Sequence, residues 1–231
     1  MKKYEHLFFD LDRTLWDFDT NSRLALNEIY LSFNLRSKGI MGVEEFVETY
    51  QKINEELWAL YRRGLLNKRK LRTVRFTKTL EAFNVDDEYL GDQLGTAYIE
   101  ISPHKTALLP NAIDVLDYLS EKYHLHIITN GFEEVQHVKL EKSGLSPYFD
   151  KVITSEQVGA RKPDPAVFHY ALKISKARAF NSLMIGDDLG ADIIGAREVG
   201  IDQVYFNPKK IEHTEELNFE MEDLIELKQI L

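Results

Sequence analysis

The chain contains no cysteine, and this absence excludes several kinds of chemistry at once. A disulfide framework, a thiol nucleophile and a cysteine metal site are all impossible. Long hydrophobic runs are missing as well. The apolar stretch near the start of the sequence ends at Asp10. That stretch is too short for a signal peptide or a membrane span, so we expect a cytoplasmic protein.

Basic residues are in the minority, with 29 lysines and arginines against 38 aspartates and glutamates and a formal net charge of −9. Nucleic acids and anionic membranes bind proteins through basic patches, so this balance argues against both as partners. At 231 residues and 44% hydrophobic content the chain can bury one good core and carry a smaller second domain. We expect a monomer or a small homo-oligomer that acts on a small molecule.

Short β-like runs alternate with helix-length amphipathic stretches along most of the sequence. After the run that ends at Asp10, the β-like runs lie at residues 124–129, 151–155, 183–187 and 203–206. Such alternation predicts βαβ units and a parallel sheet, because the crossovers between parallel strands are right-handed. The predicted fold class is therefore α/β, with a doubly wound, Rossmann-like parallel sheet.

The segment between the first two strands is far longer than a crossover, which needs only about a dozen residues or more. It reads as helix almost throughout, at residues 21–33, 43–61, 67–83 and 88–101. Pro103 disfavours continuation of the last of these helices. We therefore predict an α/β catalytic core of residues 1–16 and 102–231, interrupted by an all-helical cap domain at residues 17–101.

Asp10 and Asp12 follow directly on the first apolar run, within the stretch LFFDLDRTL. An apolar run of this length predicts a buried parallel strand, and ligands of open α/β sheets bind beyond the carboxyl ends of such strands. Two like charges at a desolvated edge need a cation or a proton to relieve their repulsion. The pair therefore predicts a metal-dependent catalytic site.

Further polar residues follow the other predicted strands. They provide a hydroxyl, a lysine and a second acidic group, and they are Thr129, Asn130, Lys162, Asp187, Asp188 and Asp192. Together with the first pair they would supply a nucleophile, an acid/base, a cationic phosphate clamp and a divalent-metal site. That combination predicts phosphoryl transfer through an aspartyl phosphate.

A purely structural role is the alternative for several of these residues taken singly. Thr129 or Asn130 would cap the following helix, and Asp188 or Asp192 would favour a helix N-terminus. Lys162 lies among loop residues with no helix C-terminus to complement, and a structural role for both Asp10 and Asp12 is hard to justify. The set as a whole therefore favours a site.

Four motifs in order, DLDRTL, TN, KPDP and GDDLGAD, resemble those of the haloacid dehalogenase-like hydrolases, and the helical insert resembles the first cap type of that superfamily. The resemblance implies Asp10 as nucleophile and Asp12 as general acid/base. It implies phosphate binding by Thr129 and Lys162, with Asn130 beside them. It also implies Mg²⁺ held by the Asp10 and Asp187 side chains and the Asp12 carbonyl, with Asp188 and Asp192 as supporting acidic residues.

The stretch 14–22 is similar to the cap entry of the bacterial house-cleaning pyrimidine nucleotidases. This likeness implies a 5′-nucleotidase acting on pyrimidine nucleoside monophosphates, with Trp16 and Phe18 as candidates for base recognition. Packing at the hinge is the alternative role for both rings. Other functions on the same core are a sugar-phosphate phosphatase or a phosphomutase; less favoured are a 2-haloacid dehalogenase, whose family lacks an aspartate equivalent to Asp12, and a receiver-like phospho-binding module.

Two remaining features have simpler explanations. Eight basic residues and no acid lie between Arg62 and Lys78, and we interpret them mainly as a solvated helix face, although one or two arginines could reach a substrate phosphate. His124 and His126 share one face of a strand, but no third ligand for a metal is evident. We interpret them as residues of the strand start.

Overall fold

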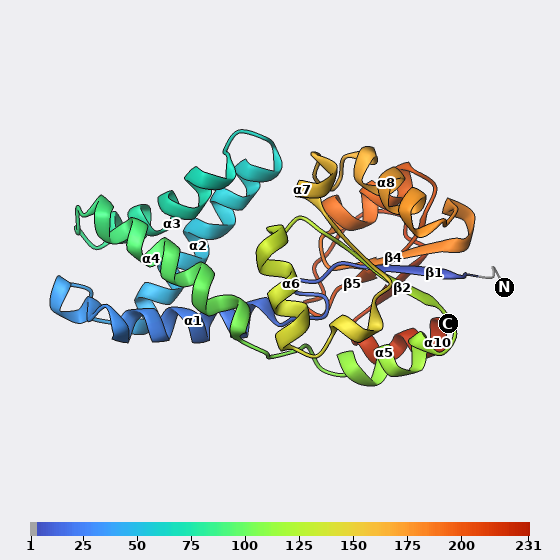
Figure 1. Cartoon of the computed structure of the whole chain (residues 1–231), viewed down its shortest axis with the longest axis horizontal. Helices are drawn as coiled ribbons and strands as arrows, with labels where there is room; N and C mark the ends of the chain where they lie inside the picture. The colour runs from blue at the N-terminus through green and yellow to red at the C-terminus, as the bar shows by residue number, and fades with distance from the viewer. Residues whose placement is uncertain (1–3) are drawn as a thin grey trace. The chain divides into compact units, whose positions relative to one another are not determined.

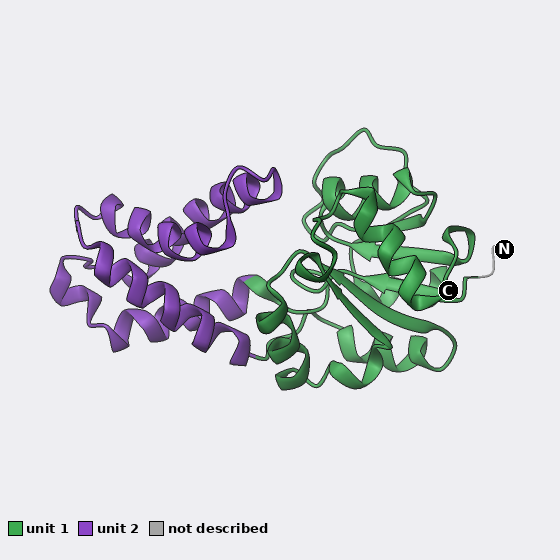
Figure 2. Cartoon of the chain, turned by 45° about the horizontal axis from the view of Figure 1, so that its top comes forward, with its two compact units in different colours: residues 1–18, 106–231 green, residues 19–105 purple. Residues whose placement is uncertain are grey.

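The computed structural model describes residues 4–231, and the first three residues of the predicted core lie outside this range. The chain divides into two compact units (Figure 2). Unit 1 contains the described residues up to 18 together with residues 106–231, and unit 2 contains residues 19–105. Among residues 4–231, no helix combines the length and apolar character needed to span a membrane.

Unit 1 is built on a six-stranded sheet with the order β3-β2-β1-β4-β5-β6, and every neighbouring pair is parallel. The strands are β1 (His6–Phe9), β2 (His124–Thr129), β3 (Lys151–Thr154), β4 (Ser182–Gly186), β5 (Asp202–Phe206) and β6 (Phe219–Met221). The predicted doubly wound α/β fold is confirmed (Figure 1). The edge strand β6 was not predicted, because three residues are too few to show a periodic pattern.

Helices cover both faces of this sheet. They are α5 (Ala112–Ser120), α6 (Glu133–Lys142), α7 (Ser155–Val158), α8 (Pro165–Ser175), α9 (Gly195–Glu198) and α10 (Leu227–Ile230). Figure 1 shows α5 and α10 on one side of the sheet and α7 and α8 on the other. Short 3₁₀ segments and one π-helical segment, Leu189–Ile194, complete the connections.

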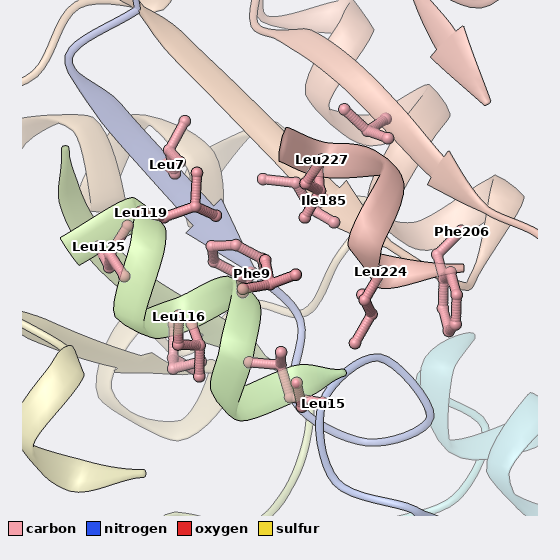
Figure 3. Close-up of a cluster of buried hydrophobic side chains, with 14 of the residues drawn as sticks. Leu7, Phe9, Leu15, Leu116, Leu119, Leu125, Ile185, Phe206, Leu224 and Leu227 are labelled. Carbon is pink, nitrogen blue, oxygen red and sulfur yellow. The ribbon is translucent and has the colours of Figure 1, made fainter. Parts of the chain in front are cut away.

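The central strand β1 supplies side chains to both cores. Leu7 and Phe9 belong to the cluster that packs against α5 and α10 (Figure 3), whereas Phe8 belongs to the cluster that packs against α8. Successive side chains of a strand point to opposite faces, which explains this division. A strand buried on both faces reads as a continuous apolar run, as the sequence of β1 does.

The chain reverses its direction of strand addition at β1. It proceeds from β1 to β2 and β3 on one side and then returns to add β4, β5 and β6 on the other. The carboxyl ends of β1, β2 and β4 therefore lie next to one another at the topological switch point, the usual ligand site of open α/β sheets. The residues that follow these three strands are those that the sequence singled out.

Unit 2 consists of four helices: α1 (Phe18–Ser32), α2 (Val43–Arg62), α3 (Lys68–Ala82) and α4 (Glu88–Ile101). Their bounds agree with the predicted helices to within one residue, except that α1 begins three residues earlier, at Phe18. The α3 start is capped by Asn67, whose side chain accepts a hydrogen bond from the Lys70 amide at 2.9 Å. Apolar and aromatic side chains from all four helices form the core of the unit.

The basic stretch between Arg62 and Lys78 is mostly exposed or half-buried, with one exception. Arg75 is only 3% exposed, and its guanidinium lies 4.7 Å from the centre of the Tyr98 ring. It donates a hydrogen bond to Asn54 Oδ1 at 3.3 Å. Arg75 is therefore an exception to the mainly solvated face, because it packs in the core of unit 2.

Candidate active site

Lys162 is the centre of the polar cluster at the switch point. Its ammonium group donates to Asp10 Oδ1 at 2.6 Å, to Asp192 Oδ1 at 2.6 Å and to the Ile128 carbonyl at 2.7 Å. These three bonds use all three protons of the ammonium. The side chain is 2% exposed, so the charge is removed from water and balanced by the two carboxylates.

Asn130 fixes the backbone of the loop that carries this lysine. Its Nδ2 donates to the Lys162 carbonyl at 3.0 Å, and its Oδ1 accepts from the Lys162 amide at 2.8 Å. The Asn130 side chain is therefore engaged with the lysine loop. The structure thus gives Asn130 a role in fixing the loop of the lysine, and its predicted place among the phosphate-binding residues stays a prediction.

Three carboxylates converge beside the lysine. Asp10, Asp187 and Asp192 each offer an oxygen atom, and these oxygens lie within 4.8 Å of one another. Asp10 follows β1 and its amide donates to the Ile185 carbonyl of β4 at 2.9 Å, which ties the two strand ends together. Within residues 4–231 this is the one group of potential ligands so closely spaced.

Gly186 makes room for the third carboxylate. A Cβ atom at this position would lie 2.3 Å from Asp192 Oδ2, closer than any real contact. The same oxygen accepts a hydrogen bond from the Asp188 amide at 3.1 Å. Glycine at the end of β4 therefore lets the Asp192 side chain fold back against the strand.

Burial is the largest influence on the ionisation of this cluster. It raises the pKa of Asp10 above its ordinary value, Lys162 opposes the rise, and Asp192 adds to it. Burial also raises the pKa of Asp187, with further increases from Asp10 and Asp192. Burial lowers the pKa of Lys162, but the two carboxylates that it contacts outweigh this effect and raise it. The site thus holds more negative charge than its lysine neutralises.

The Asp12 side chain lies outside the three-carboxylate group and has its own partners. Lys139 Nζ donates to Asp12 Oδ1 at 2.5 Å, and Gln136 Nε2 donates to Asp12 Oδ2 at 2.9 Å. Sequence reasoning missed Lys139 and Gln136. Their spacing places both on one face of α6, but no sequence signal linked that face to Asp12.

Thr129, the last residue of β2, retains a free proton to donate. Its hydroxyl oxygen accepts from the Gly131 amide at 3.0 Å and from Gln136 Nε2 at 2.7 Å. Two accepted bonds occupy both lone pairs, so the O–H hydrogen is left to point at a ligand oxygen. This arrangement suits a phosphate ligand.

Asp188 takes the structural role that was its alternative. Its Oδ1 accepts from the amides of Gly190 and Ala191 at 3.0 and 2.9 Å, which caps the π-helical segment. A further contact was not predicted: the Thr14 hydroxyl donates to Asp187 Oδ1 at 3.4 Å. Thr14 thereby helps to fix Asp187.

The two aromatic candidates differ in exposure. Trp16 is fully buried in the core of unit 1, with the Lys139 ammonium 4.1 Å from its ring centre, whereas Phe18 is partly exposed. A ring without exposed surface has no face to offer a base, so the structure favours the packing role for Trp16. Phe18 is covered on one side by the Arg13 guanidinium, 4.7 Å from its centre.

His124 and His126 belong to a group of three stacked histidines. His6 of β1 stacks between them, with ring centres 5.2 Å from His124 and 5.4 Å from His126. Both histidines lie on β2, His124 as its first residue, in keeping with the interpretation as strand-start residues. This cluster is at the opposite end of the strands from Asp10.

Comparison with known proteins gives a consistent picture. A family model for haloacid dehalogenase-like hydrolases matches residues 4–200. The chain is 35% identical to the pyrimidine 5′-nucleotidase PynA of Streptococcus pneumoniae over 92% of its length and 88% of that protein. It is 33% identical to the pyrimidine 5′-nucleotidase YjjG of Escherichia coli over 99% of its length and 98% of that protein.

Among solved structures, the magnesium-bound HAD-hydrolase YfnB of Bacillus subtilis superposes with a TM-score of 0.89 at 30% sequence identity, covering 99% of both chains. The family model spans most of the sequence, and the relatives match it nearly from end to end. The chain therefore belongs to the haloacid dehalogenase-like hydrolase family.

Proposed function

We propose that this protein is a Mg²⁺-dependent phosphomonoesterase that works through an aspartyl phosphate on Asp10. The observation that carries the proposal is the contact of Asp10 with Lys162 inside the buried three-carboxylate group. A nucleophile at a strand end, a buried cation and an acidic cluster are what phosphoryl transfer requires.

The residues present fit a magnesium ion. The three carboxylates that approach one another are hard oxygen ligands. Burial raises the pKa of all three, and repulsion within the group raises the pKa of Asp10 and Asp187 further, which a dication would relieve. We assign the side chains of Asp10 and Asp187 as ligands, with the Asp12 carbonyl. Asp192 supports them and anchors Lys162. When bound, the ion would neutralise charge on the phosphate oxygens.

In the proposed reaction a carboxylate oxygen of Asp10 attacks phosphorus in line with the leaving oxygen. Asp12, protonated when the substrate binds, gives its proton to that oxygen as the bond between phosphorus and the leaving group breaks, and becomes a carboxylate. The Thr129 hydroxyl donates to an equatorial phosphate oxygen, and the positive charge of Lys162, beside Asp10, stabilises the negative charge on the equatorial oxygens. Asp12 then takes a proton from water, which attacks the aspartyl phosphate and releases inorganic phosphate.

We propose pyrimidine nucleoside 5′-monophosphates as substrates. Two pyrimidine 5′-nucleotidases that match almost the whole chain at 33–35% identity support this choice. In this proposal the core residues bind the phosphate, and the helical unit 2, residues 19–105, would supply the selectivity for the rest of the substrate.

A panel of phosphomonoesters tests the substrate. Purified enzyme with Mg²⁺ is expected to show a higher kcat/KM for dUMP and dTMP than for sugar phosphates such as ribose 5-phosphate. If sugar phosphates are preferred tenfold, about 1.4 kcal/mol of transition-state binding, the nucleotidase assignment fails while the phosphatase assignment stands. Isomerisation of a sugar phosphate without phosphate release would instead indicate a phosphomutase.

A further inference from the structure

We propose that Lys139 and Gln136 of α6 are positioning residues that hold the Asp12 carboxylate in place for proton transfer. The inference rests on the proposed function of Asp12 as the general acid/base. It assigns to α6 a role that neither the motifs nor the family likeness indicates.

The two side chains hold Asp12 from two directions. Lys139 donates to Oδ1 at 2.5 Å and Gln136 donates to Oδ2 at 2.9 Å, so both oxygens of the carboxylate are fixed. A carboxylate has about four lone-pair sites, and two remain open after these bonds. A quarter of the Asp12 side chain, 25%, is exposed, which leaves it accessible to a substrate.

Both holding residues are themselves firmly placed. The Lys139 side chain is 5% exposed, and its ammonium lies 4.1 Å from the centre of the buried Trp16 ring. Gln136 is fully buried, and its Nε2 also donates to Thr129 Oγ1 at 2.7 Å. The amide group of Gln136 thus links the proposed acid/base to the proposed phosphate ligand.

Gly131 makes this packing possible. A Cβ at Gly131 would lie 2.2 Å from Gln136 Nε2, so any larger residue would displace the amide. The Gly131 amide also donates to Thr129 Oγ1 at 3.0 Å. The motif at the end of β2 therefore accommodates the α6 side chains as well as the hydroxyl.

Stability alone does not explain the buried ion pair. Buried ion pairs can often be replaced by apolar residues without loss of stability, because desolvation offsets their attraction. Here the site has two separate lysines: Lys162 contacts Asp10 and Asp192, and Lys139 contacts Asp12. Each proposed catalytic carboxylate is therefore paired with its own buried ammonium group. We attribute this pairing to the need to hold the nucleophile and the acid/base in separate positions.

The test compares substrates that differ in their need for leaving-group protonation. Lys139→Met is expected to lower kcat/KM for dTMP by about 10- to 100-fold, as misplacement of a catalytic group by about 1 Å does. Nitrophenyl phosphate has a leaving group that needs little protonation, so its kcat/KM should fall less than threefold. KM should change little for either substrate, and Lys139→Arg should restore part of the dTMP activity.

Two further variants keep the proposal testable if Lys139→Met does not fold. Gln136→Met keeps the side-chain volume and removes the other hydrogen bond, and it should show the same selective loss. Lys142→Met changes an exposed lysine on the same helix, 45% exposed, and should behave as the wild type. Equal losses on both substrates, an effect confined to KM, or a gain in activity would overturn the proposal.

A crystal structure of Lys139→Met separates this inference from the proposed function. The Asp12 carboxylate is expected to leave its wild-type position, and an unmoved carboxylate would refute the role of Lys139 even in an active enzyme. If the wild type releases no phosphate from either substrate, the proposed function fails, and the role of Lys139 and Gln136 in positioning Asp12 for catalysis fails with it. Loss of activity on dTMP alone, with a displaced Asp12, would support both.

Discussion

Lys162 offsets part of the negative charge of the buried site, because its ammonium donates hydrogen bonds to the carboxylates of Asp10 and Asp192 and to the Ile128 carbonyl. Removing the ammonium would leave Asp10 and Asp192 buried without a cation. Breaking a buried ion pair from one side costs about 3–5 kcal/mol.

We therefore predict that Lys162→Met lowers the free energy of unfolding by about 3–5 kcal/mol at pH 7 in the presence of chelator, measured by urea denaturation. Lys142→Met, on the surface, is expected to change it by less than about 0.5 kcal/mol. A Lys162→Met protein as stable as the wild type would show that the lysine does not compensate the carboxylates.

At this scale the sequence indicates which residues gather but not how their atoms pair. Strand ends and motif order place Asp10, Lys162 and Asp187 at one edge, and the structure brings them together there. The roles of Asn130 and Gln136 depend on hydrogen bonds between segments far apart in the chain. No local pattern encodes such bonds, so they emerge only from the folded structure.

Among the elements, the long periodic helices of unit 2 and the apolar central strands were predictable, because burial of one or both faces imposes a repeat on the sequence. The start of α1 was predicted three residues late, because Phe18 and its polar neighbours do not reveal a helix start. The short strand β6 owes its existence to pairing with β5 and not to its own sequence.

The starts of β1 and β2 carry a pH-sensitive element. Burial is the main cause that lowers the pKa of His126 from 6.5 to about 4; His6, His124 and Lys151 lower it further and Asp150 opposes them. Between pH 6.5 and about 4, His126 stays neutral in the folded protein, whereas the same histidine takes up a proton in the unfolded chain. Its contribution to stability is therefore complete above pH 6.5 and is lost as the pH falls towards 4.

We predict that His126→Gln reduces the loss of stability between pH 7 and pH 4 by on the order of 1–3 kcal/mol, measured by urea denaturation at each pH. The pKa of His6 is also lowered, chiefly by burial, so some acid sensitivity will remain. His137→Gln, at an exposed position of α6, serves as the control and should leave the dependence of the unfolding free energy on pH unchanged. The same dependence of the unfolding free energy on pH in His126→Gln as in the wild type would contradict the prediction.

For the whole molecule, the chain divides into an α/β unit and a helical unit. Unit 1 contains every residue of the proposed catalytic group, and unit 2, residues 19–105, is inserted after β1, the strand that Asp10, the proposed nucleophile, follows. The net charge of −9 argues for a small-molecule substrate, and such a substrate suits the family to which the chain belongs.

The central claim is that phosphate release depends on Asp10 and on Mg²⁺. Phosphate release from dTMP should be measured for the wild type and Asp10→Asn, each with Mg²⁺ and with excess chelator. We predict turnover by the wild type with Mg²⁺ alone, a loss of more than about 10⁴-fold in Asp10→Asn, and recovery of the chelated wild type when Mg²⁺ is restored. Undiminished release by folded Asp10→Asn, or by the wild type in chelator, would contradict the account.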